Sequence, residues 1–141
     1  MSTYLDASVL LALLIEEAGT QAMAAFLAAN EDALIVSEFA AAEVASGISR
    51  LVRMGALEAG DGHARLADFD AWRGSNTTDL DIHAPDTRLA GTFIRRFDLG
   101  LRAPDAVHAA LCRRGGHMLV TLDRRLASAA DALGIRVVTP G

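Results

Sequence analysis

Lysine is missing from this sequence of 141 residues, and all 13 of its basic residues are arginine. A single cysteine excludes an internal disulfide framework and, without an export signal, favours a cytoplasmic protein. No apolar run approaches the roughly 20 residues that a membrane helix requires, so we expect no membrane partner. Charged residues make up only 22% and hydrophobic residues 52%, which excludes a disordered chain. The length predicts one domain over residues 1–141.

A net charge of −5 argues at first against a polyanionic partner. The charges are unevenly distributed, however. Residues 1–87 hold four Arg and fourteen Asp or Glu, whereas residues 88–125 hold eight Arg and three Asp. A chain divided in this way can carry a metal site in one part and a phosphate-binding surface in the other. Arginines that only solubilise exposed helices would give the same pattern.

Short strands alternate with longer helices along the whole chain. Strands are predicted at residues 2–5, 33–36, 117–122 and 136–138, with a weaker candidate at 78–82. Helices are predicted at residues 7–17, 20–29, 38–54, 58–72 (interrupted near Gly60 and Gly62), 86–97, 104–114 and 123–133. This alternation predicts an α/β fold in which a parallel sheet lies between layers of helices.

Three aspartates are expected at the edge of this sheet where ligands gather. Asp6 and Asp123 each follow a predicted strand directly, and Asp105 lies in the first turn of a helix. Glu43 lies inside a long helix beside its apolar face, and Gly47, one turn further on, would leave room for an ion. Taken singly, each aspartate is better explained as an ordinary helix N-cap or first-turn residue.

Together the four acids indicate more than helix capping. Four carboxylates at one edge would repel one another unless a cation lay among them. Oxygen ligands without a neighbouring His or Cys cluster favour Mg²⁺ or Mn²⁺. Such an ion generates hydroxide from a bound water and neutralises charge on phosphate oxygens, which is the chemistry of phosphodiester hydrolysis.

At these residues the sequence resembles the PIN-domain family, and specifically the VapC toxins of VapBC toxin–antitoxin pairs. The resemblance covers residues 4–126. The matching pieces are Tyr4-Leu5-Asp6-Ala7-Ser8, Glu43, Arg102-Ala103-Pro104-Asp105-Ala106-Val107-His108-Ala109-Ala110 and Val120-Thr121-Leu122-Asp123-Arg124-Arg125-Leu126.

The resemblance implies a PIN-like fold with a five-stranded parallel sheet and helices on both faces. It implies an Mg²⁺-dependent endoribonuclease, with Mn²⁺ as a substitute ion, acting as the toxin of a type II toxin–antitoxin pair. It also implies a homodimer inhibited by a small VapB-like antitoxin. The catalytic and metal-binding residues it implies are Asp6, Glu43, Asp105 and Asp123, supported by the hydroxyl residues Ser8 and Thr121.

Two arginines adjoin the acidic motifs. Arg102 and Arg124 are the best candidates for RNA phosphate contacts, because a guanidinium can bind a phosphate through two nitrogens. Structural ion pairs with nearby acids are the alternative for both. His108 lies one turn after Asp105 and could touch the substrate or order a ligand, but its apolar neighbours favour a structural histidine.

Three other functions compete with a PIN ribonuclease. Receiver domains and dehalogenase-type phosphatases also place an aspartate after a parallel strand, but they rely on a lysine, which this chain lacks. A ribonuclease-H-like nuclease would need an antiparallel meander early in the chain, where two helical segments are predicted instead. The third alternative is a catalytically silent PIN-fold module that titrates a partner protein or RNA, although such a module could lose the four acids freely.

Overall fold

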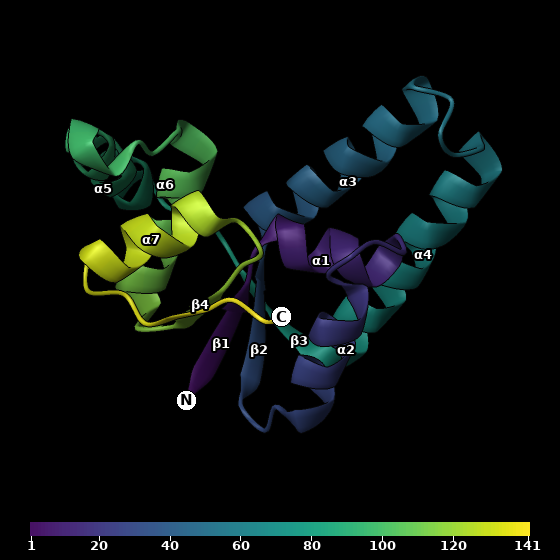
Figure 1. Ribbon diagram of the computed structural model, residues 1–141, viewed down its shortest axis with the longest axis horizontal. Coiled ribbons are helices and arrows are strands. Elements are labelled where there is room, and N and C mark those ends of the chain that lie inside the picture. Colours follow the sequence, from purple (N-terminus) through teal and green to yellow (C-terminus); the bar gives the residue numbers. More distant parts are fainter.

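Five short strands form a sheet in the order β3-β2-β1-β4-β5. Every pairing is parallel, as the alternating pattern predicts. The strands run between two groups of helices (Figure 1). The computed structural model describes residues 1–141. β1 and β4 occupy the centre and are fully buried over most of their length, whereas β3 is an exposed edge strand. The strands are β1 (Ser2–Leu5), β2 (Ala33–Ser37), β3 (Thr77–Leu80), β4 (Met118–Val120) and β5 (Val137–Val138).

Helices cover both faces of the sheet, because successive strand residues point to opposite sides. Tyr4 and Leu119 pack against α5 (Ala84–Ile94), α6 (Ala103–Gly115) and α7 (Arg124–Ala132). Leu5 and Val120 pack on the other side against the remaining helices. These are α1 (Ala7–Leu14), α2 (Thr20–Ala29), α3 (Glu38–Arg53) and α4 (Ala59–Asn76).

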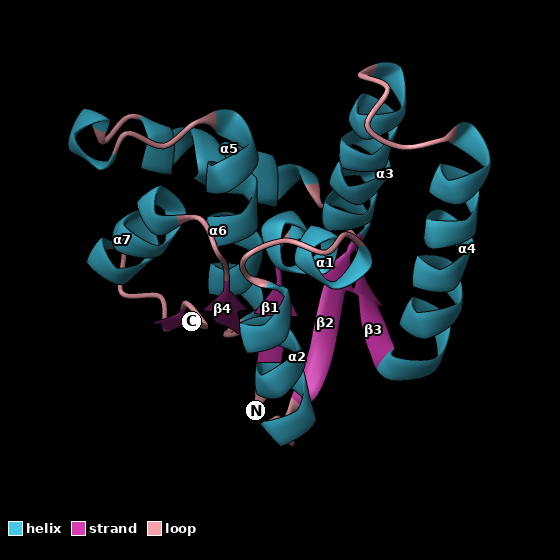
Figure 2. Cartoon of the chain, turned by 45° about the vertical axis from the view of Figure 1, so that its right-hand side comes forward, coloured by secondary structure: helices cyan, strands magenta, loops and turns pink.

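The long helices α3 and α4 form a hairpin that extends beyond the sheet (Figure 2). Gly55, at a φ of 76°, makes the left-handed turn after α3. The predicted interruption of α4 near Gly60 and Gly62 is wrong, because α4 is continuous. Gly62 is buried there, and a Cβ atom would lie 3.0 Å from the side chain of Val52, so the glycine permits close helix packing.

Helix α5 begins earlier and ends earlier than the predicted range 86–97. Pro85 lies inside its first turn, where a missing N–H is tolerated. The Asp86 carboxylate accepts a 2.8 Å hydrogen bond from the His83 backbone N–H and so fixes the start of the helix. Residues 97–99 form a separate 3₁₀ turn, η1 (Phe97–Leu99), which ends at Gly100 in the left-handed region.

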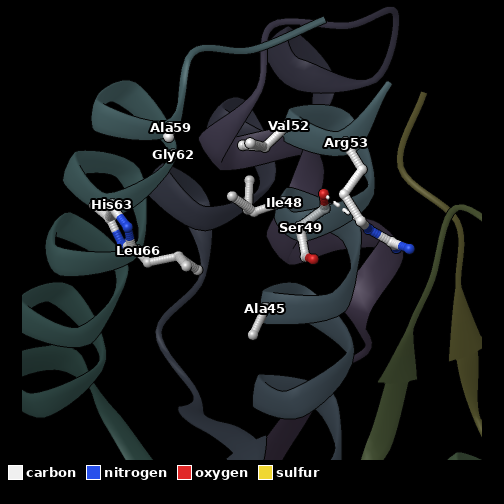
Figure 3. Close-up of a pocket in the computed structure, with 9 residues that line it drawn as sticks. All are labelled: Ala45, Ile48, Ser49, Val52, Arg53, Ala59, Gly62, His63 and Leu66. Atoms are coloured by element: carbon white, nitrogen blue, oxygen red, sulfur yellow. Dashed lines mark hydrogen bonds between the residues drawn. The ribbon is translucent and has the colours of Figure 1, made fainter. Parts of the chain in front are cut away.

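A groove of about 210 Å³ lies between α3 and α4 (Figure 3). Apolar side chains, including Ile48, Val52 and Leu66, form most of its lining. None of the four acids highlighted by the sequence lies in it. No helix of the structure has the length and apolar character needed to cross a bilayer.

Candidate functional site

Asp6 and Thr121 are neighbours at the carboxyl edge of the sheet. The register pairs Leu5 of β1 with Val120 of β4, so the residues that follow the two strands lie side by side. The Thr121 hydroxyl donates a 2.5 Å hydrogen bond to Oδ2 of Asp6. The Ser8 hydroxyl donates a 2.6 Å hydrogen bond to the other oxygen, Oδ1. Both carboxylate oxygens of Asp6 are therefore oriented by hydroxyl groups.

Asp6 is held in an environment that opposes its charge. Asp6 is only 3% exposed, and this burial raises the pKa of its carboxyl group. Hydrogen bonds from Ser8 and Thr121 lower the same pKa and offset part of the effect. Asp6 also caps α1, since its Oδ1 accepts from the Val9 N–H at 3.2 Å. A cation near this carboxylate would relieve the cost of burying it.

Asp123 caps α7 and is tied to the same threonine. Its Oδ1 accepts hydrogen bonds from the backbone N–H groups of Arg125 and Leu126, at 2.9 and 3.2 Å. Its own backbone N–H donates to Thr121 Oγ1 at 3.0 Å. The N-cap interpretation is thus correct for Asp123, and only its Oδ1 oxygen, not Oδ2, caps the helix.

Asp105 is the least satisfied of the four acids. It lies buried in the first turn of α6, and its Oδ2 is a buried oxygen without a hydrogen-bond partner. Arg102 Nε is 3.6 Å away, too far for a hydrogen bond, on a side chain that is 71% exposed. Burial and then the negative charge of Asp123 raise the pKa of Asp105, so the two carboxylates are electrostatic neighbours.

Glu43 reaches the site from the opposite helix layer and meets a histidine. Its Oε1 is 2.5 Å from Nε2 of His108, which lies on α6 one turn after Asp105. His108 is only 3% exposed, and its Nδ1 is 2.6 Å from the Tyr4 hydroxyl. The expectation of a structural histidine among apolar residues therefore missed its contact with Glu43. The one-turn spacing from Asp105 was the sequence signal.

Gly47 does not leave a space for an ion, contrary to the expectation from sequence. A Cβ atom at this position would lie 2.8 Å from Cδ1 of Leu11. The glycine therefore allows α1 to approach α3 closely, and the space beside it is filled by an apolar side chain.

The basic segment 88–125 is only partly available for binding. Arg113 lies over the Phe93 ring, and Arg114 pairs with buried Asp86 at 2.7 Å. These two arginines stabilise the α5–α6–α7 layer. Arg102 and Arg124 are both exposed, and each lies beside one of the acidic residues at the start of α6 or α7. The alternative of a structural ion pair applies to Arg102, whose Nε lies 3.6 Å from Oδ2 of Asp105.

The edge of the sheet thus gathers oxygen ligands without forming a closed metal cage. No three His, Cys, Asp or Glu side chains have the mutual geometry of a metal-ion site. Three of the carboxylates instead accept hydrogen bonds from Thr121, His108 or helix N–H groups. The Oδ2 of Asp105 has no hydrogen bond and only the exposed Arg102 guanidinium at 3.6 Å, so this oxygen, beside the charge of Asp123, nevertheless fits a hard divalent cation.

Comparison of the sequence with protein families gives a match to the PIN domain over residues 3–132. No functionally curated protein matches the chain.

Several solved structures share the fold at low sequence identity. VapBC2 from Rickettsia felis, bound to a promoter DNA fragment, has a TM-score of 0.74 and 14% identity, with 100% of both chains covered. VapC20 from Mycobacterium tuberculosis, described as a sarcin–ricin loop cleaving toxin, has a TM-score of 0.73 and 19% identity over 90% of this chain and 94% of that chain. A FitAcB structure from Neisseria gonorrhoeae has a TM-score of 0.73 and 19% identity over 97% and 96%.

Proposed function

The chain belongs to the PIN-domain family, and we propose that it is a divalent-metal-dependent endoribonuclease, the VapC-type toxin of a type II toxin–antitoxin pair. The observation that carries the proposal is the buried Oδ2 of Asp105, which has no hydrogen-bond partner, at the sheet edge that also holds Asp6 and Asp123. A protein interior rarely leaves such an oxygen unpaired. Proteins named VapBC and VapC among the similar structures support the toxin assignment.

We assign distinct roles to the residues of the site. Asp6, Glu43, Asp105 and Asp123 would hold Mg²⁺, or Mn²⁺ in its place. The bound ion would supply a hydroxide nucleophile and neutralise charge on the scissile phosphate. Ser8 and Thr121 orient the Asp6 carboxylate through their hydrogen bonds, at 2.6 and 2.5 Å.

Arg102 and Arg124 are proposed to bind the RNA backbone beside the acids. Both side chains are exposed at helix starts next to Asp105 and Asp123. A planar guanidinium matches two phosphate oxygens, and its charge offsets the repulsion between the acids and the RNA. The description of VapC20 as a sarcin–ricin loop cleaving toxin supports RNA as the substrate class.

The test is RNA cleavage by the purified protein with Mg²⁺, with EDTA, and as the Asp6→Asn variant. We expect cleavage only with Mg²⁺ and a loss of at least 100-fold in Asp6→Asn. Asp70→Asn, which changes an exposed acid on α4, is the matched control and should cleave normally. Unchanged cleavage in Asp6→Asn would refute the site. Metal binding without cleavage of any RNA would favour the silent binding module instead.

A small VapB-like antitoxin is the proposed protein partner, and a homodimer is the proposed assembly. The similar structures include VapBC structures and one described as a toxin–antitoxin complex, which supports an antitoxin for this chain. We propose that the apolar groove between α3 and α4 receives an apolar antitoxin segment.

The groove assignment is tested with two alanines. Ala45 lines the groove, whereas Ala64 is exposed on α4 outside it. Ala45→Arg should abolish co-purification with the small protein encoded beside the toxin, and Ala64→Arg should not. Equal retention by both variants would place the antitoxin elsewhere. Light scattering on the purified toxin measures whether it is a dimer.

A further inference from the structure

We propose that His108 and Tyr4 form a buried hydrogen-bonded relay that positions the Glu43 carboxylate for the metal ion. The proposal rests on the proposed function, because it assigns a role to residues behind the acidic site. The Tyr4 hydroxyl is 2.6 Å from His108 Nδ1, and His108 Nε2 is 2.5 Å from Glu43 Oε1. Both His108 and Tyr4 are buried, so the hydrogen bond between them is shielded from water, whereas the Glu43 side chain is 31% exposed.

The relay has a defined direction. An ionised carboxylate can only accept hydrogen bonds, so toward an ionised Glu43 the N–H at Nε2 of His108 is the hydrogen-bond donor. In the neutral ring, Nδ1 is then an acceptor, and the Tyr4 hydroxyl donates to it. Tyr4 therefore selects the tautomer that can donate to Glu43.

The relay continues to the start of the helix that carries Glu43. Ser37 Oγ lies 2.8 Å from the Tyr4 hydroxyl and accepts a 2.9 Å hydrogen bond from the Ala40 N–H. Ser37 is the N-cap of α3. The same relay thus fixes both the start of α3 and the carboxylate that α3 presents at its second turn.

Aromatic packing holds the histidine ring in place. The Tyr4 ring meets it edge-on at 5.6 Å between centroids, and the Phe39 ring lies 5.3 Å away on another side. Because the His108 ring is already confined in this way, its Nε2 points at Glu43 before a metal binds. Metal binding therefore costs no further side-chain entropy of His108.

The relay also joins the elements that carry the acids. Tyr4 precedes Asp6 by two residues, and His108 follows Asp105 by one helical turn. Glu43 is the one acid that comes from a helix interior rather than from a strand or helix end, so its flexible side chain has no capping role to orient it. An oriented hydrogen bond to one oxygen of Glu43 leaves the other free for the ion.

Mn²⁺ binding by the purified, RNA-free protein tests the relay, measured by the loss of the free-ion electron paramagnetic resonance signal. His108→Leu removes both hydrogen bonds at similar volume and should weaken Mn²⁺ binding about 10- to 100-fold. His108→Gln keeps a donor near the Nε2 position and should restore part of the affinity. Tyr4→Phe removes only the hydroxyl and should show a smaller loss in the same direction.

His117→Leu is the matched control. His117 also contacts the Tyr4 ring, at 6.5 Å between centroids, but its Nδ1 bonds Ser2 at the opposite end of β1. Its replacement should leave Mn²⁺ affinity unchanged. In a Glu43→Gln background, His108→Leu should cause no further loss, because its effect acts through Glu43. RNA cleavage should show a reduced kcat with an unchanged KM in His108→Leu.

The outcomes separate this inference from the proposed function. If wild-type protein binds no Mn²⁺, the proposed metal site and the proposed relay are both wrong. If wild-type protein binds Mn²⁺ and His108→Leu and Tyr4→Phe bind it equally well, only the relay is wrong. Equal losses from His108→Leu in the wild-type and Glu43→Gln backgrounds would likewise overturn it. Urea unfolding of each variant shows whether a loss of Mn²⁺ binding comes from misfolding. If His108→Leu is misfolded, Mn²⁺ binding by Tyr4→Phe tests the relay instead.

Discussion

Thr121 donates a 2.5 Å hydrogen bond to the buried carboxylate of Asp6, across 115 residues of sequence. The same hydroxyl oxygen accepts the backbone N–H of Asp123. One short side chain therefore joins the ends of the two central strands and sets the positions of two proposed metal ligands. A hydroxyl is suited to this place because it donates and accepts at once.

We expect Thr121→Val, which has a similar shape, to destabilise the protein by about 1–3 kcal/mol, because a buried carboxylate and a backbone N–H each lose a partner. Urea unfolding measures the change. Thr92→Val is the control, since Thr92 is exposed and bonds only the Arg88 carbonyl within its own helix. Equal stability of wild type and Thr121→Val would show that the Asp6–Thr121 bond contributes nothing net.

Much of the fold follows from the strand and helix pattern. Tyr4 and Leu5 point to opposite faces of the sheet and pack into different cores. A strand with helices on both faces therefore appears in the sequence as a short continuous apolar run. The edge strand at Thr77–Leu80 gave the weakest signal because little of it is buried. Gly62 was misread as an interruption, since sequence alone does not distinguish a glycine that breaks a helix from one that lets another helix approach.

The site was predictable only in part. Asp6 and Asp123 follow strands, so their arrival at one edge is dictated by a parallel sheet. The partners of Glu43 could not be read from the sequence, because His108 is 65 residues away and meets it through tertiary packing. Tyr4 was likewise visible only as a buried strand residue, and its hydroxyl contacts depend on how α3 and α6 are placed.

The N-cap of α3 is expected to contribute measurably to stability. Ser37→Ala removes the acceptor for the Ala40 N–H and a partner of the buried Tyr4 hydroxyl, so we expect a loss of roughly 1–2 kcal/mol in urea unfolding. Glu58 is a matched control, because it occupies the N-cap position of α4 without a side-chain capping bond. Glu58→Ala should change stability by less than about 0.5 kcal/mol. Similar effects of both variants would contradict the capping argument.

Arg102 and Arg124 are expected to contribute to RNA affinity through charge. Each alanine variant should weaken binding of a single-stranded RNA to an Asp6→Asn background and lower the slope of log affinity against log salt by about 0.7. Fluorescence anisotropy at several salt concentrations measures both quantities. Arg50→Ala, on the exposed side of α3, is the control and should change neither. An unchanged slope in Arg102→Ala and Arg124→Ala would exclude phosphate contacts.

The stability of the metal-free protein should depend on pH through Asp105. Burial, and then the charge of Asp123, raise the pKa of Asp105 above its value of about 3.9 in an unfolded chain. Between these two pKa values the folded state binds more protons than the unfolded state. The contribution of Asp105 to stability therefore falls as pH rises through this window, and the loss is complete above the raised pKa.

Asp105→Asn removes this penalty, so in EDTA we expect the variant to be more stable than wild type at pH 7.5, with a difference that shrinks as the pH falls toward about 3.9. Mg²⁺ should reverse the order at pH 7.5, because it stabilises the wild-type carboxylates by binding only the folded state. Asp131→Asn, at an exposed position of α7, should show neither effect. Thermal unfolding with and without Mg²⁺ measures all three proteins. A wild type that is the more stable in EDTA would mean that Asp105 is satisfied by the protein alone, which would remove the main support for a cation at this edge of the sheet.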